Sequence, residues 1–132
     1  MIQPNELRIG NWVKVEDACC KVVGVGQIFA TLCRYGENKT FVLPSIEPIP
    51  LTDELTAKLL NENAWDYNGC GIESYNYVYI GKRSLELKRI GGIAWEPTID
   101  MDEDGIGEKI FYLHQLQNLY YALYHEELEV KL

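Results

Sequence analysis

The chain has 132 residues, with 20 acidic and 12 basic side chains and a formal net charge of −8 at pH 7. This length suits one domain, or two very small domains that share a core. The acidic balance disfavours nucleic acid as the main partner, because nonspecific binding needs Lys and Arg to neutralise phosphates. No apolar run approaches the ~20 residues of a membrane span, and residues 1–10 do not resemble a secretory signal.

The four cysteines give no metal signature. Cys19 and Cys20 are adjacent, and Cys33 and Cys70 stand alone, so no pair has CxxC or zinc-ligand spacing. We expect reduced thiols in a cytoplasmic protein that has no cofactor and no membrane association.

Residues 8–50 alternate between apolar and polar residues in short runs separated by Gly, Asn and acidic turns. The expected strands are residues 9–15, 20–25, 29–35 and 40–43, with a turn at 36–39. Strands of this length and spacing predict an SH3-like small β-barrel or a bent sheet. The SH3-like interpretation is an analogy of fold and carries no function by itself.

A proline-bearing connector, residues 44–50, leads to an expected helix. Thr52 is placed to cap that helix, and the two acidic residues after it complement the helix N-terminus. The helix should end near residues 61–63.

The second half returns to strand patterns. The expected strands are residues 75–80, 84–90, 93–99 and 108–111, with a short edge strand in the tail at 128–132. An antiparallel meander of these strands would lie between two helices.

The clearest helix is Tyr112–Leu128. At 100° per residue its leucines share one arc with Tyr112 and Tyr120, which predicts a helix laid on a core. The opposite arc holds polar residues, which we expect to be exposed: His114, Gln115, Gln117, Asn118, Tyr121 and His125. The two histidines are about 16 Å apart along the axis, so they cannot share a metal ion.

These patterns predict an α+β protein. Residues 1–50 would form the SH3-like β-region with its proline connector. Residues 51–132 would form a helix–meander–helix unit, and the two parts would pack as one body.

An acidic segment opens like a calcium loop. Asp100, Asp102 and Asp104 alternate and a glycine follows, as hard cations require. The twelfth position, where a bidentate Glu is needed, is Phe111. A solvated acidic loop is therefore favoured over a metal site.

Two surfaces are candidates for partner binding. Gln115, Gln117, Asn118 and Tyr121 form a large, uncharged face on the C-terminal helix, and charge depletion marks interface cores. Lys82, Arg83, Lys88 and Arg89 are the nearest approach to a basic cluster. No nucleophile motif is present, so we expect no enzyme activity. Two carboxylates that the fold pairs in a cleft would not be detected from sequence motifs.

Three blocks resemble an uncharacterised family of small proteins encoded in phages, prophages and other mobile elements of gut Bacteroidetes. They are NELRIGNWV at residues 5–13, IPLT at 49–52, and HQLQNLYYAL at 114–123 followed by EEL at 126–128. In that family Thr-Gly usually precedes EEL, whereas Tyr124-His125 stands here, which leaves the helix end undefined. The resemblance implies a bacterial host but supplies no activity and no site residues.

The first functional hypothesis is a non-catalytic accessory protein of phage or mobile-element origin that contacts an unidentified host or phage protein. The alternatives are a nucleic-acid-associated SH3-like module and an unrecognised enzyme.

Overall fold

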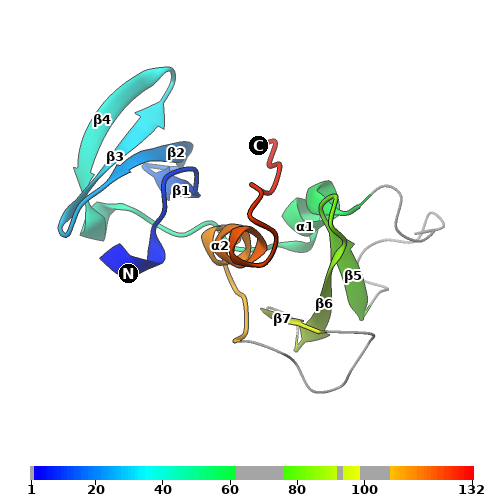
Figure 1. The fold of residues 1–132 in the computed structure, drawn as a ribbon. Helices are drawn as coiled ribbons and strands as arrows, with labels where there is room; N and C mark the ends of the chain where they lie inside the picture. Colours follow the sequence, from blue (N-terminus) through cyan, green and yellow to red (C-terminus); the bar gives the residue numbers. More distant parts are fainter. Residues whose placement is uncertain (1, 62–75, 92–93, 99–107) are drawn as a thin grey trace. The chain divides into compact units, whose positions relative to one another are not determined.

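The computed structural model describes residues 2–61, 76–91, 94–98 and 108–132. These contain two α-helices and seven strands in two antiparallel sheets, so the expected α+β class is confirmed (Figure 1). The chain divides into two compact units. Unit 1 contains residues 1–50, 112–127 and 132, and unit 2 contains residues 51–111 and 128–131.

Unit 1 is built on a four-stranded meander. Its strands are β1 (Trp12–Val15), β2 (Ala18–Val25), β3 (Phe29–Arg34) and β4 (Glu37–Val42), in the order β1-β2-β3-β4. The four expected strands are therefore present. Among the described residues they form an open sheet and not a closed barrel.

Two tight turns set the register of this sheet. Glu16 and Asp17 have φ of 49° and 64°, and Tyr35 and Gly36 have φ of 52° and 79°. Two central residues with positive φ form the hairpin turn whose twist matches that of paired strands. The second turn closes at Glu37, so β4 begins three residues earlier than the expected strand at 40–43.

Alternation along the strands buries one face of the sheet. The 3₁₀ helix η2 (Leu43–Ser45) follows β4 and contributes to the same core. The buried core residues of this sheet and its flanking segments are Ile2, Leu7, Val13, Val15, Cys20, Val22, Ala30, Leu32, Leu43 and Ile46.

Beyond η2 the chain returns to β1. Lys14 donates its N–H to the Glu47 carbonyl at 2.8 Å, and Glu47 donates back to the Lys14 carbonyl at 2.8 Å. At the other end of unit 1, the 3₁₀ helix η1 (Pro4–Glu6) precedes the segment that enters β1.

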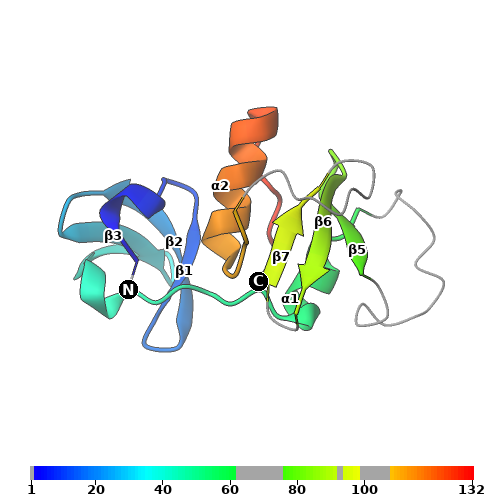
Figure 2. The same ribbon diagram turned by 90° about the horizontal axis from the view of Figure 1, so that it is seen from below.

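Unit 2 begins with α1 (Asp53–Leu59). The Thr52 side chain accepts a hydrogen bond from the Leu55 N–H at 3.2 Å, which confirms the expected cap. The strands β5 (Tyr77–Ile80), β6 (Leu85–Ile90) and β7 (Ala94–Pro97) form an antiparallel sheet in that order, as Figure 2 shows.

The core of unit 2 comes from α1 and the inward faces of its sheet. Val78, Ile80 and Leu87 are fully buried, as the alternation predicts. Of the expected strand at 108–111, an isolated bridge joins Ile110 to Trp95. The expected strand in the tail is wrong, because residues 128–132 carry no strand.

The C-terminal helix is shorter than expected. The helix α2 spans Leu113–Tyr124, whereas the sequence predicted a helix to Leu128. His125 adopts a left-handed conformation with φ 55° and donates its N–H to the Tyr121 carbonyl at 2.8 Å. A histidine therefore ends the helix in the backbone conformation that glycine usually supplies.

The two units meet at residue 50, where the sequence placed the boundary, but the C-terminal helix belongs to a different unit than expected. The segment that contains α2 groups with the N-terminal sheet and not with residues 51–111. The Leu113 N–H donates to the Ile49 carbonyl at 2.8 Å, and Pro50 forms a bridge with Tyr112. Backbone hydrogen bonds thus attach the start of α2 to the end of the proline connector.

Candidate functional site

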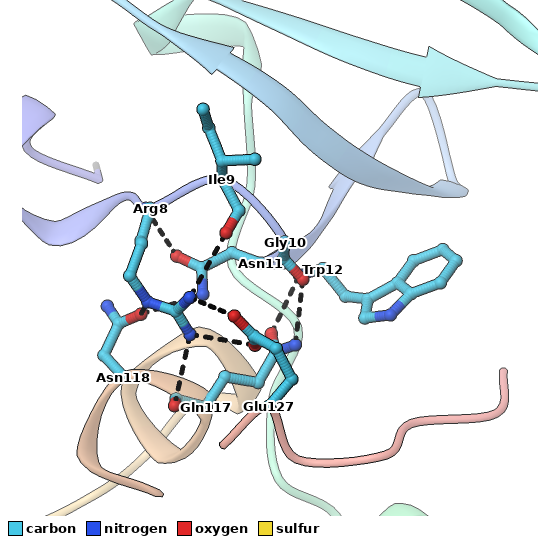
Figure 3. A network of polar contacts seen from close by, with 8 residues as sticks. All are labelled: Arg8, Ile9, Gly10, Asn11, Trp12, Gln117, Asn118 and Glu127. Carbon is cyan, nitrogen blue, oxygen red and sulfur yellow. Dashed lines mark hydrogen bonds and ion pairs between the residues drawn. The ribbon is translucent and has the colours of Figure 1, made fainter. Parts of the chain in front are cut away.

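The densest polar cluster of unit 1 joins the segment before β1 to α2 (Figure 3). We call it the Arg8 network. Its members with side chains in the cluster are Arg8, Asn11, Gln117, Asn118 and Glu127.

Gln117 acts on the backbone of β1 as a neighbouring peptide group would. Its Oε1 accepts from the Trp12 N–H at 2.8 Å, and its Nε2 donates to the Gly10 carbonyl at 3.1 Å. The side chain is 1% exposed. Gly10 itself has φ of 101°, a conformation suited to glycine. Gln117 and Glu47 together supply hydrogen bonds to the outer edge of β1.

Two asparagines continue the cluster. The Asn118 Oδ1 accepts from Asn11 Nδ2 at 2.8 Å, and Asn118 Nδ2 donates to the Glu6 carbonyl at 2.7 Å. The Asn11 Oδ1 accepts from the Arg8 N–H at 2.8 Å, and Asn11 is fully buried. Buried amides of this kind are stable only when their polar atoms are paired.

Arg8 joins the network to Glu127 and to the Tyr121 ring. Its guanidinium makes a two-pronged ion pair with Glu127, with Nη2 3.1 Å from Oε2 and Nη1 bonded to Oε1. The Arg8 Nε donates to Asn118 Oδ1 at 3.3 Å, and the guanidinium lies 4.4 Å from the centre of the Tyr121 ring. The planar fork of Arg suits both contacts.

The predicted exposed face of α2 is therefore largely wrong. Gln117 is buried and Asn118 is bonded within the unit, while the Gln115 Oε1 accepts from the Tyr112 N–H at 3.1 Å. Of the four predicted interaction residues, only Tyr121 is exposed, at 39%, and its ring lies against Arg8. The face contacts the chain's own N-terminal segment, which offers backbone groups to the amides.

The two histidines differ from each other. His125 is exposed at the end of α2, but His114, expected on the exposed face, is buried. Within the described residues neither ring nitrogen of His114 has a hydrogen-bond partner. Burial lowers the pKa of His114, and Glu6 opposes that shift weakly. A neutral imidazole packed against its neighbours fits these surroundings.

The remaining predicted metal and thiol sites are not supported by grouped side chains among the described residues. The calcium-loop residues Asp100, Asp102 and Asp104 lie outside the described residues, as does Cys70. In the described part of the chain no three His, Cys, Asp or Glu side chains are grouped as metal ligands. Cys20 is buried, and burial raises the pKa of its thiol.

The four basic residues of unit 2 do not form one cluster. Lys82 and Arg83 occupy the turn between β5 and β6, and the register places Lys88 opposite Tyr77 at the far end of that hairpin. Successive residues on a strand point to opposite faces, which separates Lys88 from Arg89. Arg89 is bonded to Asp53 at 3.0 Å and stacks on Trp95.

An exposed apolar surface appears where the sequence predicted only strands. We call it the hairpin patch, because it surrounds the β2–β3 turn and includes the end of β4. Its members are Val23, Val25, Ile28, Phe29 and Val42, which are 37–64% exposed. Phe29 and Val42 are direct cross-strand partners. A signal was available in the sequence, since residues 22–32 contain no charged side chain.

No family model, no curated protein and no solved structure matches this chain. Within the described residues, no helix has the length and hydropathy needed to cross a membrane.

Proposed function

We propose that this protein is a non-catalytic accessory protein that binds a partner protein through the hairpin patch. The observation that carries the proposal is the exposure of Ile28 at 64% and Phe29 at 45% beside three exposed valines. Exposed apolar side chains that are close together on a surface are typical of protein-binding sites.

The composition of the patch supports a protein partner. Its two hairpin strands carry no charge between residues 22 and 32, and depletion of charge distinguishes interface cores from ordinary surface. Val23, Val25, Phe29 and Val42 lie on strands of the sheet, and Ile28 lies in the turn that joins β2 to β3. The sheet holds the strand side chains in place before a partner arrives. A preorganised surface loses less conformational entropy on binding.

The proposal includes the SH3-like architecture of unit 1. It is supported by the order of elements: a four-strand meander, then η2, then a residue that pairs with β1 through Lys14 and Glu47. The setting in a phage or mobile element of a bacterial host rests on the three sequence blocks. Two of those blocks, around Arg8 and Gln117, meet in the Arg8 network.

The test is a tagged pull-down from host lysate, with nuclease added, read by mass spectrometry. The double variant Ile28→Gln/Phe29→Gln should lose a protein that the wild type retains. The matched control is Ile9→Gln/Leu123→Gln, which changes two other exposed apolar side chains of unit 1, 60% and 45% exposed.

A partner retained equally by both double variants contradicts the proposal. Partners that disappear on nuclease treatment favour the nucleic-acid-associated alternative instead.

A further inference from the structure

The two edges of the unit 1 sheet differ in whether their backbone groups have hydrogen-bond partners. The outer edge of β1 is bonded to Gln117 and Glu47. On the opposite edge, β4 pairs with β3 alone among the described residues. Residues Glu37–Thr40 are all exposed, so the free side of β4 is open to solvent. An open strand edge is a template for another strand.

The register shows which backbone groups this edge offers. Arg34 and Glu37 flank a two-residue turn, so they form a hydrogen-bonded pair. Alternation along an antiparallel ladder then directs the backbone groups of Lys39 toward β3. Those of Asn38 and Thr40 point away from the sheet.

The two charged side chains of β4 lack a partner in their own unit. Glu37 lies across the hairpin from Arg34, but the Arg34 guanidinium is bonded to Glu16 at 2.9 Å and stacks on Tyr35. Neither Glu37 nor Lys39 forms an ion pair with any described residue.

We propose that β4 pairs antiparallel with β4 of a second copy of this chain, about a twofold axis at Asn38. In that register Asn38 exchanges both backbone hydrogen bonds with Asn38 of the second copy. Glu37 then faces Lys39 of the second copy, and the symmetry repeats the pair. These are non-hydrogen-bonded positions, where opposed side chains approach most closely.

The charges select this register from its neighbours. Moving the axis to Lys39 also keeps the backbone geometry, because Asn38 then pairs with Thr40 of the second copy, but it places two lysines opposite each other. Moving it to Thr40 keeps the backbone geometry but places Lys39 opposite Phe41 and leaves Glu37 without a cation. Self-complementarity of one patch is what a twofold interface requires.

A lysine on an edge strand can instead prevent pairing with another strand. The two roles make opposite predictions. If Lys39 guards the edge, its removal promotes association. If it binds Glu37 of the second copy, reversing its charge abolishes association.

This self-association involves the free edge of β4 and not the hairpin patch, so it goes beyond the proposed function and can fail independently of it. The shared surface is one short strand from each copy. We expect a weak dimer, with a dissociation constant on the order of 0.1–1 mM at low salt.

The test is sedimentation equilibrium of the full chain at low salt, at concentrations up to about 1 mM. The wild type should show concentration-dependent dimers. Lys39→Glu and Glu37→Lys should each weaken the dimer at least about tenfold, because like charges then face each other. The double variant Glu37→Lys/Lys39→Glu should restore it, since the swapped charges are again complementary.

A backbone variant provides an independent check. Asn38→Pro removes an N–H that the ladder within the chain does not use, because Pro is tolerated where the N–H of an edge strand faces solvent. It should abolish the dimer while the circular dichroism spectrum is unchanged. A monomeric wild type, a Lys39→Glu variant that dimerises as well as or better than the wild type, or a double variant that stays monomeric would each overturn the proposal.

Discussion

The outer strands of the unit 1 sheet, β1 and β4, differ in how their edge backbone groups are hydrogen-bonded. At β1 the backbone groups of Gly10 and Trp12 are bonded to the amide of Gln117, and those of Lys14 to Glu47. At β4 the corresponding groups face solvent. β1 has four residues and β4 has six. The difference in hydrogen bonding comes from what the rest of the unit brings to each edge.

The comparison shows that a side-chain amide can complete a sheet where a strand is missing. A carboxamide carries a C=O acceptor and an N–H donor on one planar group, as a peptide does, and it has a second N–H in addition. Placed on α2, the Gln117 carboxamide pairs with a backbone N–H and a backbone C=O together. An edge completed in this way cannot recruit another strand, whereas an edge like that of β4 can.

Amide hydrogen exchange gives the most direct contrast between the edges, and the largest expected effect. At concentrations where the protein is monomeric, the N–H groups of Trp12 and Lys14 should exchange more slowly than those of Asn38 and Thr40. A factor on the order of a hundred or more is expected, because hydrogen-bonded amides exchange only through opening. Similar rates in NMR exchange spectra at the two edges would show that Gln117 does not hold β1.

Removing the amide should open the covered edge. In Gln117→Met the Trp12 N–H and the Gly10 carbonyl lose their partners at a part-buried site. The free energy of unfolding should fall by about 1–3 kcal/mol, because an unpaired group costs about 1–3 kcal/mol when buried and less where water reaches it. Urea denaturation measures this loss of unfolding free energy. The control is Gln115→Met, which removes the bond to the Tyr112 N–H from a less buried side chain of the same helix, and a loss as large there would refute the interpretation.

Arg8 reinforces the covered edge from outside, so its removal should cost less. Arg8→Met should lower the free energy of unfolding by about 1–2 kcal/mol, because the ion pair with Glu127 is partly exposed and therefore screened. Arg8→Lys keeps the charge but loses the fork, so it should recover only part of this loss. Full recovery in urea denaturation would show that charge alone matters.

The end of α2 offers a smaller gain. His125→Gly should raise the free energy of unfolding by about 0.5–1 kcal/mol, because glycine adopts the left-handed conformation without steric cost. His125→Ala keeps the unfavourable conformation and removes the ring, so it separates backbone strain from the ring's contact with Tyr121. If the alanine variant is stabilised equally, strain is not the cause.

The free energy of unfolding should depend on pH through His114, which is buried near the start of α2. The native pKa of His114 lies below its ordinary value of 6.5, so the unfolded chain binds more protons as the pH falls. The stabilisation that neutral His114 contributes to the fold is therefore fully present above pH 6.5. It is lost as the pH falls through the lowered native pKa. Urea midpoints between about pH 5 and pH 7.5 should fall toward acid, and His114→Leu should remove that part of the slope.

Much of the fold could be predicted, because it depends on local patterns. The alternation in β1 to β3, the cap at Thr52 and the buried face of β5 all follow from residue order and are confirmed. In β6 the expected Leu85 and Leu87 are buried, but Glu86 between them is buried as well, which alternation does not predict. The start of β4 was missed because the Tyr35–Gly36 turn contains a tyrosine, and a tyrosine with positive φ is not a common turn signal.

The Arg8 network could not be predicted, because its partners are distant in sequence. A helical wheel ranks residues by hydropathy and so places His114 and Gln117 toward solvent. Gln117 is buried because backbone groups 105 and 107 residues away supply its hydrogen bonds. Leu123, assigned to the buried arc, is 45% exposed for the converse reason: the described chain provides nothing to cover it.

The discontinuity of unit 1 has a consequence during synthesis. The ribosome completes β1 to β4 long before it makes α2, since residues 51–111 intervene. At about 5–20 residues per second, several seconds pass in which Gln117 does not yet exist. During that interval Glu47 can already pair with Lys14, but Gly10 and Trp12 lack their Gln117 partner and the β4 edge is open. The nascent chain is therefore more exposed to wrong strand pairing before its last helix emerges.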